Sequence, residues 1–260
     1  MKLVEDINNK VLVRVVWLHS ATVFTKIFAG FLTTKFIAIF IGAEGLALIG
    51  NLRNFLTSVQ SFATLNLYNG IVKFIGEFKN DLTKLSKILS TVYYIGFVSM
   101  FSISLLCYFN SDFINDIIFS DRFNYGYVIK ILAIALPFYA LNMFSFSIMN
   151  GFAKYKFLMI INIIGQIMGL CVTLILIWQD KIDGALVSVV ISPSLIFLIT
   201  VVGIVNRRNF ISHLKVSNID FQLIKKLSPF SLMAIVSGFA LPFVMIAIRN
   251  YIIKIEGMEA

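Results

Sequence analysis

Long apolar segments separated by short polar connections dominate this chain. Of its 260 residues, 59% are hydrophobic and 13% are charged, whereas a soluble domain is usually about 45–50% apolar. A run of about 20 mostly apolar residues can cross the hydrocarbon layer of a membrane as an α-helix. A membrane β-barrel would show short segments of alternating polarity instead. The sequence therefore predicts an all-α, polytopic integral membrane helix bundle.

Seven segments are long enough to be membrane spans. They lie at about 18–41, 46–72, 88–109, 128–150, 157–178, 184–205 and 229–250. Helical transporters are commonly built from paired repeats with an even number of spans. Because seven is odd and the chain stops soon after the last segment, we expect it to be a portion of a longer transporter.

The basic residues outside the spans predict the orientation. Lysines and arginines gather at the N-terminus and in the connections 73–87, 151–156 and 206–228, whereas the connections 110–127 and 179–183 carry aspartates. Connections rich in lysine and arginine stay in the cytoplasm. The N-terminus is therefore predicted to be cytoplasmic. This placement also accounts for much of the net charge of +9, so we do not expect a nucleic-acid partner.

Three basic residues lie inside the first two spans without an acid at similar depth: Lys26, Lys35 and Arg53. A charge at the bilayer centre costs about 2.5–3.5 kcal/mol on insertion scales, so it usually has a function. Their shared sign favours a negatively charged cargo. Lys26 and Lys35 point to opposite faces of an ideal helix, and both can line one cavity only if the helix bends near Gly30. Otherwise Lys35 reaches the outer interface.

The second span is far more polar than the others. Arg53 shares one helical face with three neutral polar residues, Thr57, Gln60 and Thr64, and Asn54 begins a neighbouring row. Such a face avoids lipid and contacts either other helices or a water-filled cavity. The arginine is well shaped for bidentate contact with a phosphate. We predict that Arg53, Lys26 and Lys35 bind an anionic head group and that Asn54, Thr57, Gln60 and Thr64 provide polar lining.

Other polar residues give weaker signals. Asparagine and glutamine side chains in later spans are candidates for either cavity or packing roles: Asn142, Asn150, Asn162 and Gln166. The two histidines, His19 and His213, are too few and too far apart to indicate a metal site. Neither a metal nor another cofactor is predicted.

Several stretches of the chain resemble one family of transporters. They are Lys26–Lys35, Gly42–Phe55, Asn69–Lys73, Lys226–Ile235 and Leu241–Phe243 with Arg249. They resemble Wzx-type O-antigen translocases and are especially similar to the lipid III flippases of enterobacterial common antigen assembly. The resemblance implies the polysaccharide-exporter branch of the MOP superfamily, whose members have about twelve helices in two six-helix lobes. By that comparison, residues 1–205 form the first lobe, 206–228 a cytoplasmic linker and 229–260 the first helix of an incomplete second lobe.

The same resemblance implies a function. These translocases move undecaprenyl-pyrophosphate-linked oligosaccharides from the cytoplasmic to the periplasmic leaflet of the bacterial inner membrane and are not enzymes. Expected partners are the lipid-linked oligosaccharide, membrane lipids and, further, a polysaccharide polymerase and a chain-length regulator.

Two rival functions remain open from the residues alone. A cation-coupled multidrug exporter of the same superfamily should carry Asp or Glu within its spans, and none lies mid-membrane here. A membrane-bound polysaccharide polymerase or glycosyltransferase should have a large external loop or a carboxylate cluster for its chemistry. The longest outward connection predicted is under twenty residues.

Overall fold

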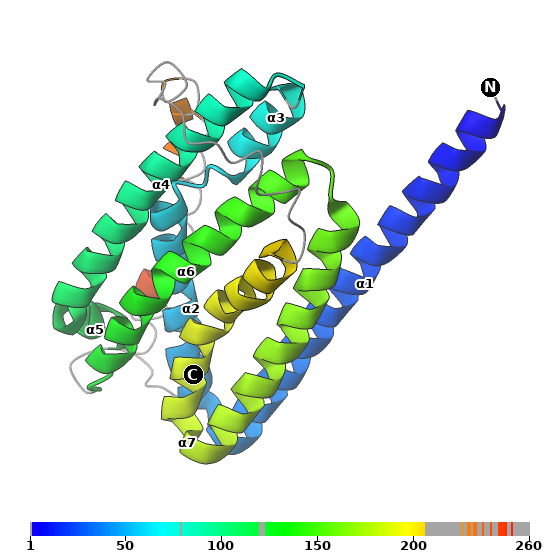
Figure 1. Ribbon diagram of the computed structural model, residues 1–260. Helices are drawn as coiled ribbons and strands as arrows, with labels where there is room; N and C mark the ends of the chain where they lie inside the picture. Colours follow the sequence, from blue (N-terminus) through cyan, green and yellow to red (C-terminus); the bar gives the residue numbers. More distant parts are fainter. Residues whose placement is uncertain are drawn as a thin grey trace.

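The computed structural model describes residues 2–78, 80–119 and 123–205, together with isolated positions between 225 and 251. In these ranges all regular secondary structure is α-helical (Figure 1). The helices are α1 Lys2–Phe40, α2 Gly42–Thr64, α3 Tyr68–Phe78, α4 Leu82–Phe109, α5 Ser111–Phe119, α6 Gly126–Gly151 and α7 Tyr155–Val205. Most of the predicted connection 206–228 and more than half of the predicted span 229–250 lie outside the described residues.

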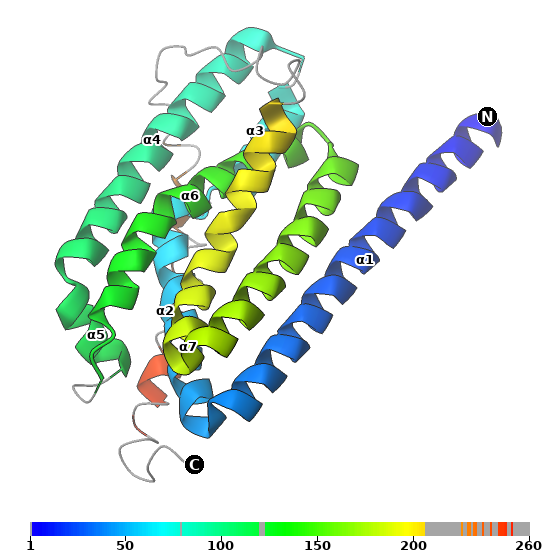
Figure 2. The ribbon, with the colours of Figure 1, turned by 60° about the horizontal axis from the view of Figure 1, so that its bottom comes forward.

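Helix α7 consists of two arms that double back on each other (Figure 2). The helical geometry is interrupted at Asp180 and at Lys181, which has φ 48° and ψ −113°. The arms, 155–179 and 182–205, correspond to the two predicted spans in this region. In the described residues, four stretches are long and apolar enough to cross a membrane: Val16–Phe40, Thr83–Phe109, Gly126–Gly151 and Tyr155–Ile204, which contains both arms. The prediction of a polytopic helical membrane protein is confirmed.

The predicted single span 46–72 was wrong, because the chain breaks between α2 and α3. Leu65 and Asn66 both adopt left-handed backbone geometry, with φ 49° and φ 45°. The break is held from outside α2: the Ser99 hydroxyl of α4 donates to the Phe62 backbone carbonyl at 2.8 Å, and the Ser231 hydroxyl donates to the Leu65 carbonyl. Helix α3 then packs against α4 and α6.

The connection predicted at 110–127 contains a short helix, α5, which the sequence analysis missed. Asn115, buried on α5, closes the return to α6. Its side-chain amide donates to the Phe123 carbonyl at 2.7 Å, and its side-chain oxygen accepts from the Tyr125 backbone N–H at 2.8 Å. This pair of hydrogen bonds fixes α5 against the start of α6.

Helix α1 is continuous and packs along α7 through one stripe. Ala29, Thr33 and Ile37, spaced four residues apart, are its buried side chains there, whereas large apolar residues such as Phe24 and Phe31 are exposed, as expected for contact with lipid. The N-terminal part of α1 extends beyond the bundle (Figures 1 and 2). Because α1 has no break at Gly30, the bend that would bring Lys35 to the side of Lys26 is absent.

Helix α2 lies between α4, α6 and α7 and is buried on most sides. Its apolar residues Leu48, Leu52, Val59 and Ala63 belong to the main core. Asn51, only 2% exposed, donates its side-chain amide to the Ile118 backbone carbonyl of α5 at 3.1 Å. This contact sets the rotation of α2 about its axis, and with it the direction in which Arg53 points.

Candidate functional site

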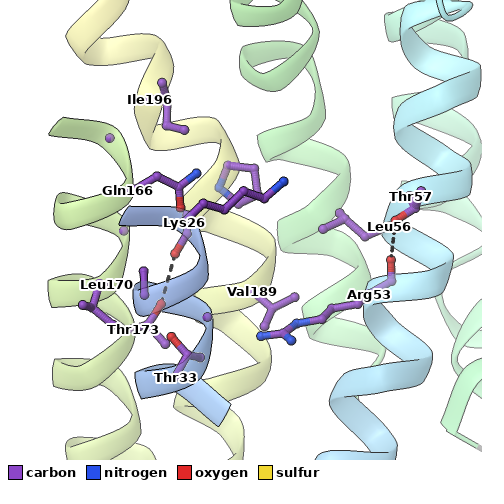
Figure 3. A pocket seen from close by; sticks show the side chains of 16 residues that line it. Lys26, Thr33, Arg53, Leu56, Thr57, Gln166, Leu170, Thr173, Val189 and Ile196 are labelled. Atoms are coloured by element: carbon purple, nitrogen blue, oxygen red, sulfur yellow. Dashed lines mark hydrogen bonds between the residues drawn. The ribbon is translucent and has the colours of Figure 1, made fainter. Parts of the chain in front are cut away.

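A cavity of about 620 Å³ lies between α1, α2 and the two arms of α7 (Figure 3). Ligand pockets in proteins usually measure about 300–1,000 Å³, so this one can hold a sizeable head group. Its lining is drawn from all three helices: Lys26, Ala29, Gly30, Thr33, Arg53, Leu56, Thr57, Gly165, Gln166, Gly169, Leu170, Thr173, Val189, Ser192, Pro193 and Ile196.

Two cations enter this cavity from different helices. Lys26 projects from α1, and the Arg53 guanidinium extends from α2 toward α1 and α7 (Figure 3). No aspartate or glutamate is among the described residues that line the space. Both cations are solvent-exposed within the open cavity, and without an acid beside them their charges attract an anion, most strongly where the surrounding dielectric constant is low. The site is therefore electrostatically suited to a negatively charged ligand.

Arg53 faces the cavity because the sequence of α2 places apolar residues on its other sides. Leu52 and Val59 are buried on the core-facing side, and Arg53 and Thr57 follow each other by one turn on the cavity side. The Thr57 hydroxyl donates to the Arg53 backbone carbonyl at 2.9 Å, so its oxygen lone pairs remain available to accept a hydrogen bond from a ligand.

The wall formed by α7 is neutral and carries polar groups among apolar side chains. Thr173 and Ser192, from opposite arms, lie with their hydroxyl oxygens 3.3 Å apart, and Gln166 presents an amide to the same space (Figure 3). Pro193 has no backbone N–H, so the helical partner of the Val189 carbonyl is missing where both residues line the cavity. Hydroxyl, amide and carbonyl groups of this kind can exchange hydrogen bonds with sugar hydroxyls.

The structure brings together some of the predicted site residues and not others. Lys26, Arg53 and Thr57 line the cavity, as does Gln166 among the weaker candidates. Lys35 is exposed elsewhere on α1. Three predicted lining residues of α2 lie outside the cavity lining: Asn54 and Gln60 are half-buried, and Thr64 is buried and donates to the Gln60 carbonyl at 2.7 Å.

The sequence analysis missed the contribution of α7. Gly165, Gly169 and Thr173 recur every four residues and so share one face of the first arm. That spacing also marks close helix packing in membranes, and Gly165 does pack there: a Cβ on it would lie 2.8 Å from Cγ1 of Ile196. The small-residue signal was present in the sequence, but it did not distinguish a cavity wall from a helix contact.

Comparison with curated proteins identifies similar transporters. The chain is 24% identical over 234 residues to the lipid III flippase of Escherichia coli (strain K12) and equally to that of Shigella flexneri. The aligned region covers 89% of this chain and 55% of each flippase. The chain thus spans about half the length of the curated relatives that it matches.

A solved structure and a family profile also match the chain. A solved structure described as "protein A" superposes with a TM-score of 0.70 at 15% identity, over 95% of this chain and 57% of the other; at that identity it shows a shared fold alone. A family profile for polysaccharide biosynthesis proteins matches residues 52–254, which is most of the chain. On the evidence of this match, the chain belongs to the polysaccharide biosynthesis protein family.

Proposed function

We propose that this protein is a flippase that moves a pyrophosphate-linked lipid oligosaccharide across the bacterial inner membrane, from the cytoplasmic to the periplasmic leaflet. The single observation that carries the proposal is the placement of Lys26 and Arg53 around one cavity that no described carboxylate lines. The similarity to lipid III flippases supports the same class of cargo.

The charge of the cavity matches the charge of the head group. A pyrophosphate diester carries about two negative charges, and two cations in a low-dielectric cavity would offset its cost of leaving water. Outward movement of two negative charges is also electrically favourable, by about 2.3 kcal/mol per charge per 100 mV with the inside negative. The membrane potential could therefore contribute to transport in this direction.

The chain would supply one lobe of the transporter. In this proposal residues 1–205 form the first six-helix lobe, with the two arms of α7 as its last two spans. Residues 206–228 form a cytoplasmic linker, and residues 229–260 begin a second lobe, as in a two-lobe MOP-type transporter. The N-terminus would be cytoplasmic. The cargo would be an O-antigen or enterobacterial-common-antigen-like repeat unit, which a polymerase and a chain-length regulator would then use.

The cation-coupled exporter is less well supported by the cavity. Binding of a cation or a cationic drug requires an acid or a dense set of oxygen ligands. Two positive side chains at the same site would repel such a ligand. An ion-coupling site elsewhere is compatible with the flippase proposal, but the cargo site itself favours an anion.

A reconstitution experiment tests the function. The complete gene product is placed in liposomes that carry a polyprenyl-pyrophosphate-linked oligosaccharide, and a sugar-modifying enzyme added outside reports the lipid that reaches the outer leaflet. We expect protein-dependent translocation of this lipid and none of a cationic dye. Dye transport without lipid translocation would favour the exporter instead.

A further inference from the structure

The face of α1 that lines the cavity includes a glycine, Gly30, which has no side chain to fill the space beside it. Lys26, Gly30 and Thr33 are spaced by one helical turn and all line the cavity. The buried stripe of Ala29, Thr33 and Ile37 holds α1 against α7. Gly30 lies beside this stripe and is exposed, so it takes no part in the close contact between the helices.

The space around Gly30 differs from that around most glycines of the bundle. A Cβ on Gly30 would meet nothing within 4 Å beyond its own helix backbone. By contrast, a Cβ on Gly96 would lie 2.4 Å from the Phe144 ring, and one on Gly203 would lie 2.6 Å from Phe157. Those glycines permit side chains of neighbouring helices to approach. Packing gives no such reason for a glycine at position 30.

Helix formation does not explain a glycine at position 30 either. Glycine destabilises a helix relative to alanine because it has more backbone freedom to lose. Helix α1 is unbroken from Lys2 to Phe40, so Gly30 does not serve a kink or a cap in this structure. The missing side chain leaves room inside the cavity, one turn from Lys26, and Thr173 and Ser192 line the same cavity.

We propose that Gly30 determines specificity: the absence of a side chain provides clearance for the sugar next to the pyrophosphate, and the volume at position 30 limits the size of that sugar. The inference rests on the proposed function. The cations of Lys26 and Arg53 bind the pyrophosphate, and the sugar lies against the α1 backbone at Gly30. The sugar hydroxyls form hydrogen bonds with Gln166, Thr173 and Ser192.

A binding experiment with two ligands tests this inference. The complete protein is purified as wild type, Gly30→Ala and Gly30→Leu, and binding is measured for a bare polyprenyl pyrophosphate and for the same lipid bearing an oligosaccharide. We expect Gly30→Leu to weaken binding of the glycosylated lipid tenfold or more, Gly30→Ala to weaken it less, and both to leave binding of the bare lipid within twofold. The melting temperature of Gly30→Ala should equal or exceed that of the wild type.

Gly76 on α3 is the matched control. It is also an exposed helical glycine, where a Cβ would meet nothing within 4 Å beyond its own helix backbone, but it lies outside the cavity lining. Gly76→Ala and Gly76→Leu should bind both lipids as the wild type does.

Each contrary result has a distinct meaning. If Gly30→Leu binds both lipids normally, or binds both more weakly by the same factor, the sugar does not lie against Gly30 and the inference is overturned. If Gly30→Ala is as impaired as Gly30→Leu, backbone freedom rather than volume matters, which also overturns it. If the wild type binds neither lipid, the proposed function itself fails.

Discussion

The side-chain amide of Asn51 on α2 donates a hydrogen bond to the backbone carbonyl of Ile118 at the end of α5, across 3.1 Å. Arg53 is two residues further along α2, which is about 200° around the helix. The side of α2 that contacts α5 is thus nearly opposite the side that carries Arg53. The hydrogen bond between Asn51 and Ile118 thereby orients α2 so that Arg53 faces the cavity.

Replacing Asn51 should therefore affect both stability and transport. Asn51→Leu leaves the Ile118 carbonyl without this donor in a buried position, which costs about 1–3 kcal/mol. We expect a lower unfolding midpoint in detergent and reduced lipid translocation. Asn54→Ala, on a half-buried neighbour, should lower the midpoint less. An Asn51→Leu variant with wild-type stability would show that the contact does not position α2.

A second polar contact should stabilise the packing of α6 against α7. The Thr200 hydroxyl donates to the Asn142 side-chain oxygen at 2.6 Å, and both residues are buried. Hydrogen bonds between membrane helices contribute about 0.6 kcal/mol on average and up to about 1.7 kcal/mol. A double-mutant cycle with Thr200→Val and Asn142→Leu should give a coupling energy in this range. A coupling indistinguishable from zero would contradict the assignment.

The end of α6 offers a stabilising substitution. Ala153 has φ 56°; its N–H donates to the Asn150 carbonyl, and the Lys154 N–H donates to the Met149 carbonyl, each at 2.9 Å. This is a Schellman motif with alanine at the left-handed position that glycine prefers. Ala153→Gly should raise stability by up to about 1 kcal/mol. Ala21→Gly, in the middle of α1, should lower stability by about 0.5–1 kcal/mol. Chemical denaturation in micelles measures both, and the same sign for both variants would refute the explanation.

The sequence predicted those features that follow from long runs of hydrophobic residues. The spans later found in α1, α4, α6 and both arms of α7 were predictable because lipid requires about 20 apolar residues in a row. Arg53 and Lys26 stood out because a charge in such a run is costly. The break at Leu65 and Asn66 was not predictable, since no proline or glycine marks it and the Ser99 hydroxyl that donates to the Phe62 carbonyl there is far away in sequence.

The site was less predictable than the spans for a related reason. Lys35 could have joined Lys26 only through a bend, and whether a helix bends at one glycine depends on its neighbours. Asn54, Gln60 and Thr64 share the polar character of Thr57, but the rotation and the end of α2 decide which of them meet the cavity. The contribution of Thr173 and Ser192 arises only when the arms of α7 fold together.

The most direct test of the central claim is the affinity of the complete protein for a polyprenyl-pyrophosphate-linked oligosaccharide in the variants Lys26→Gln and Arg53→Gln, with Lys35→Gln as control. Loss of a hydrogen bond to a charged group costs about 1.5–3 kcal/mol, and about 1.4 kcal/mol is tenfold in affinity. We predict that each cavity variant binds about ten- to a hundredfold more weakly while remaining folded, and that Lys35→Gln, whose side chain is exposed outside the cavity, binds like the wild type. Unchanged binding in both Lys26→Gln and Arg53→Gln would contradict the assignment of this cavity to an anionic head group.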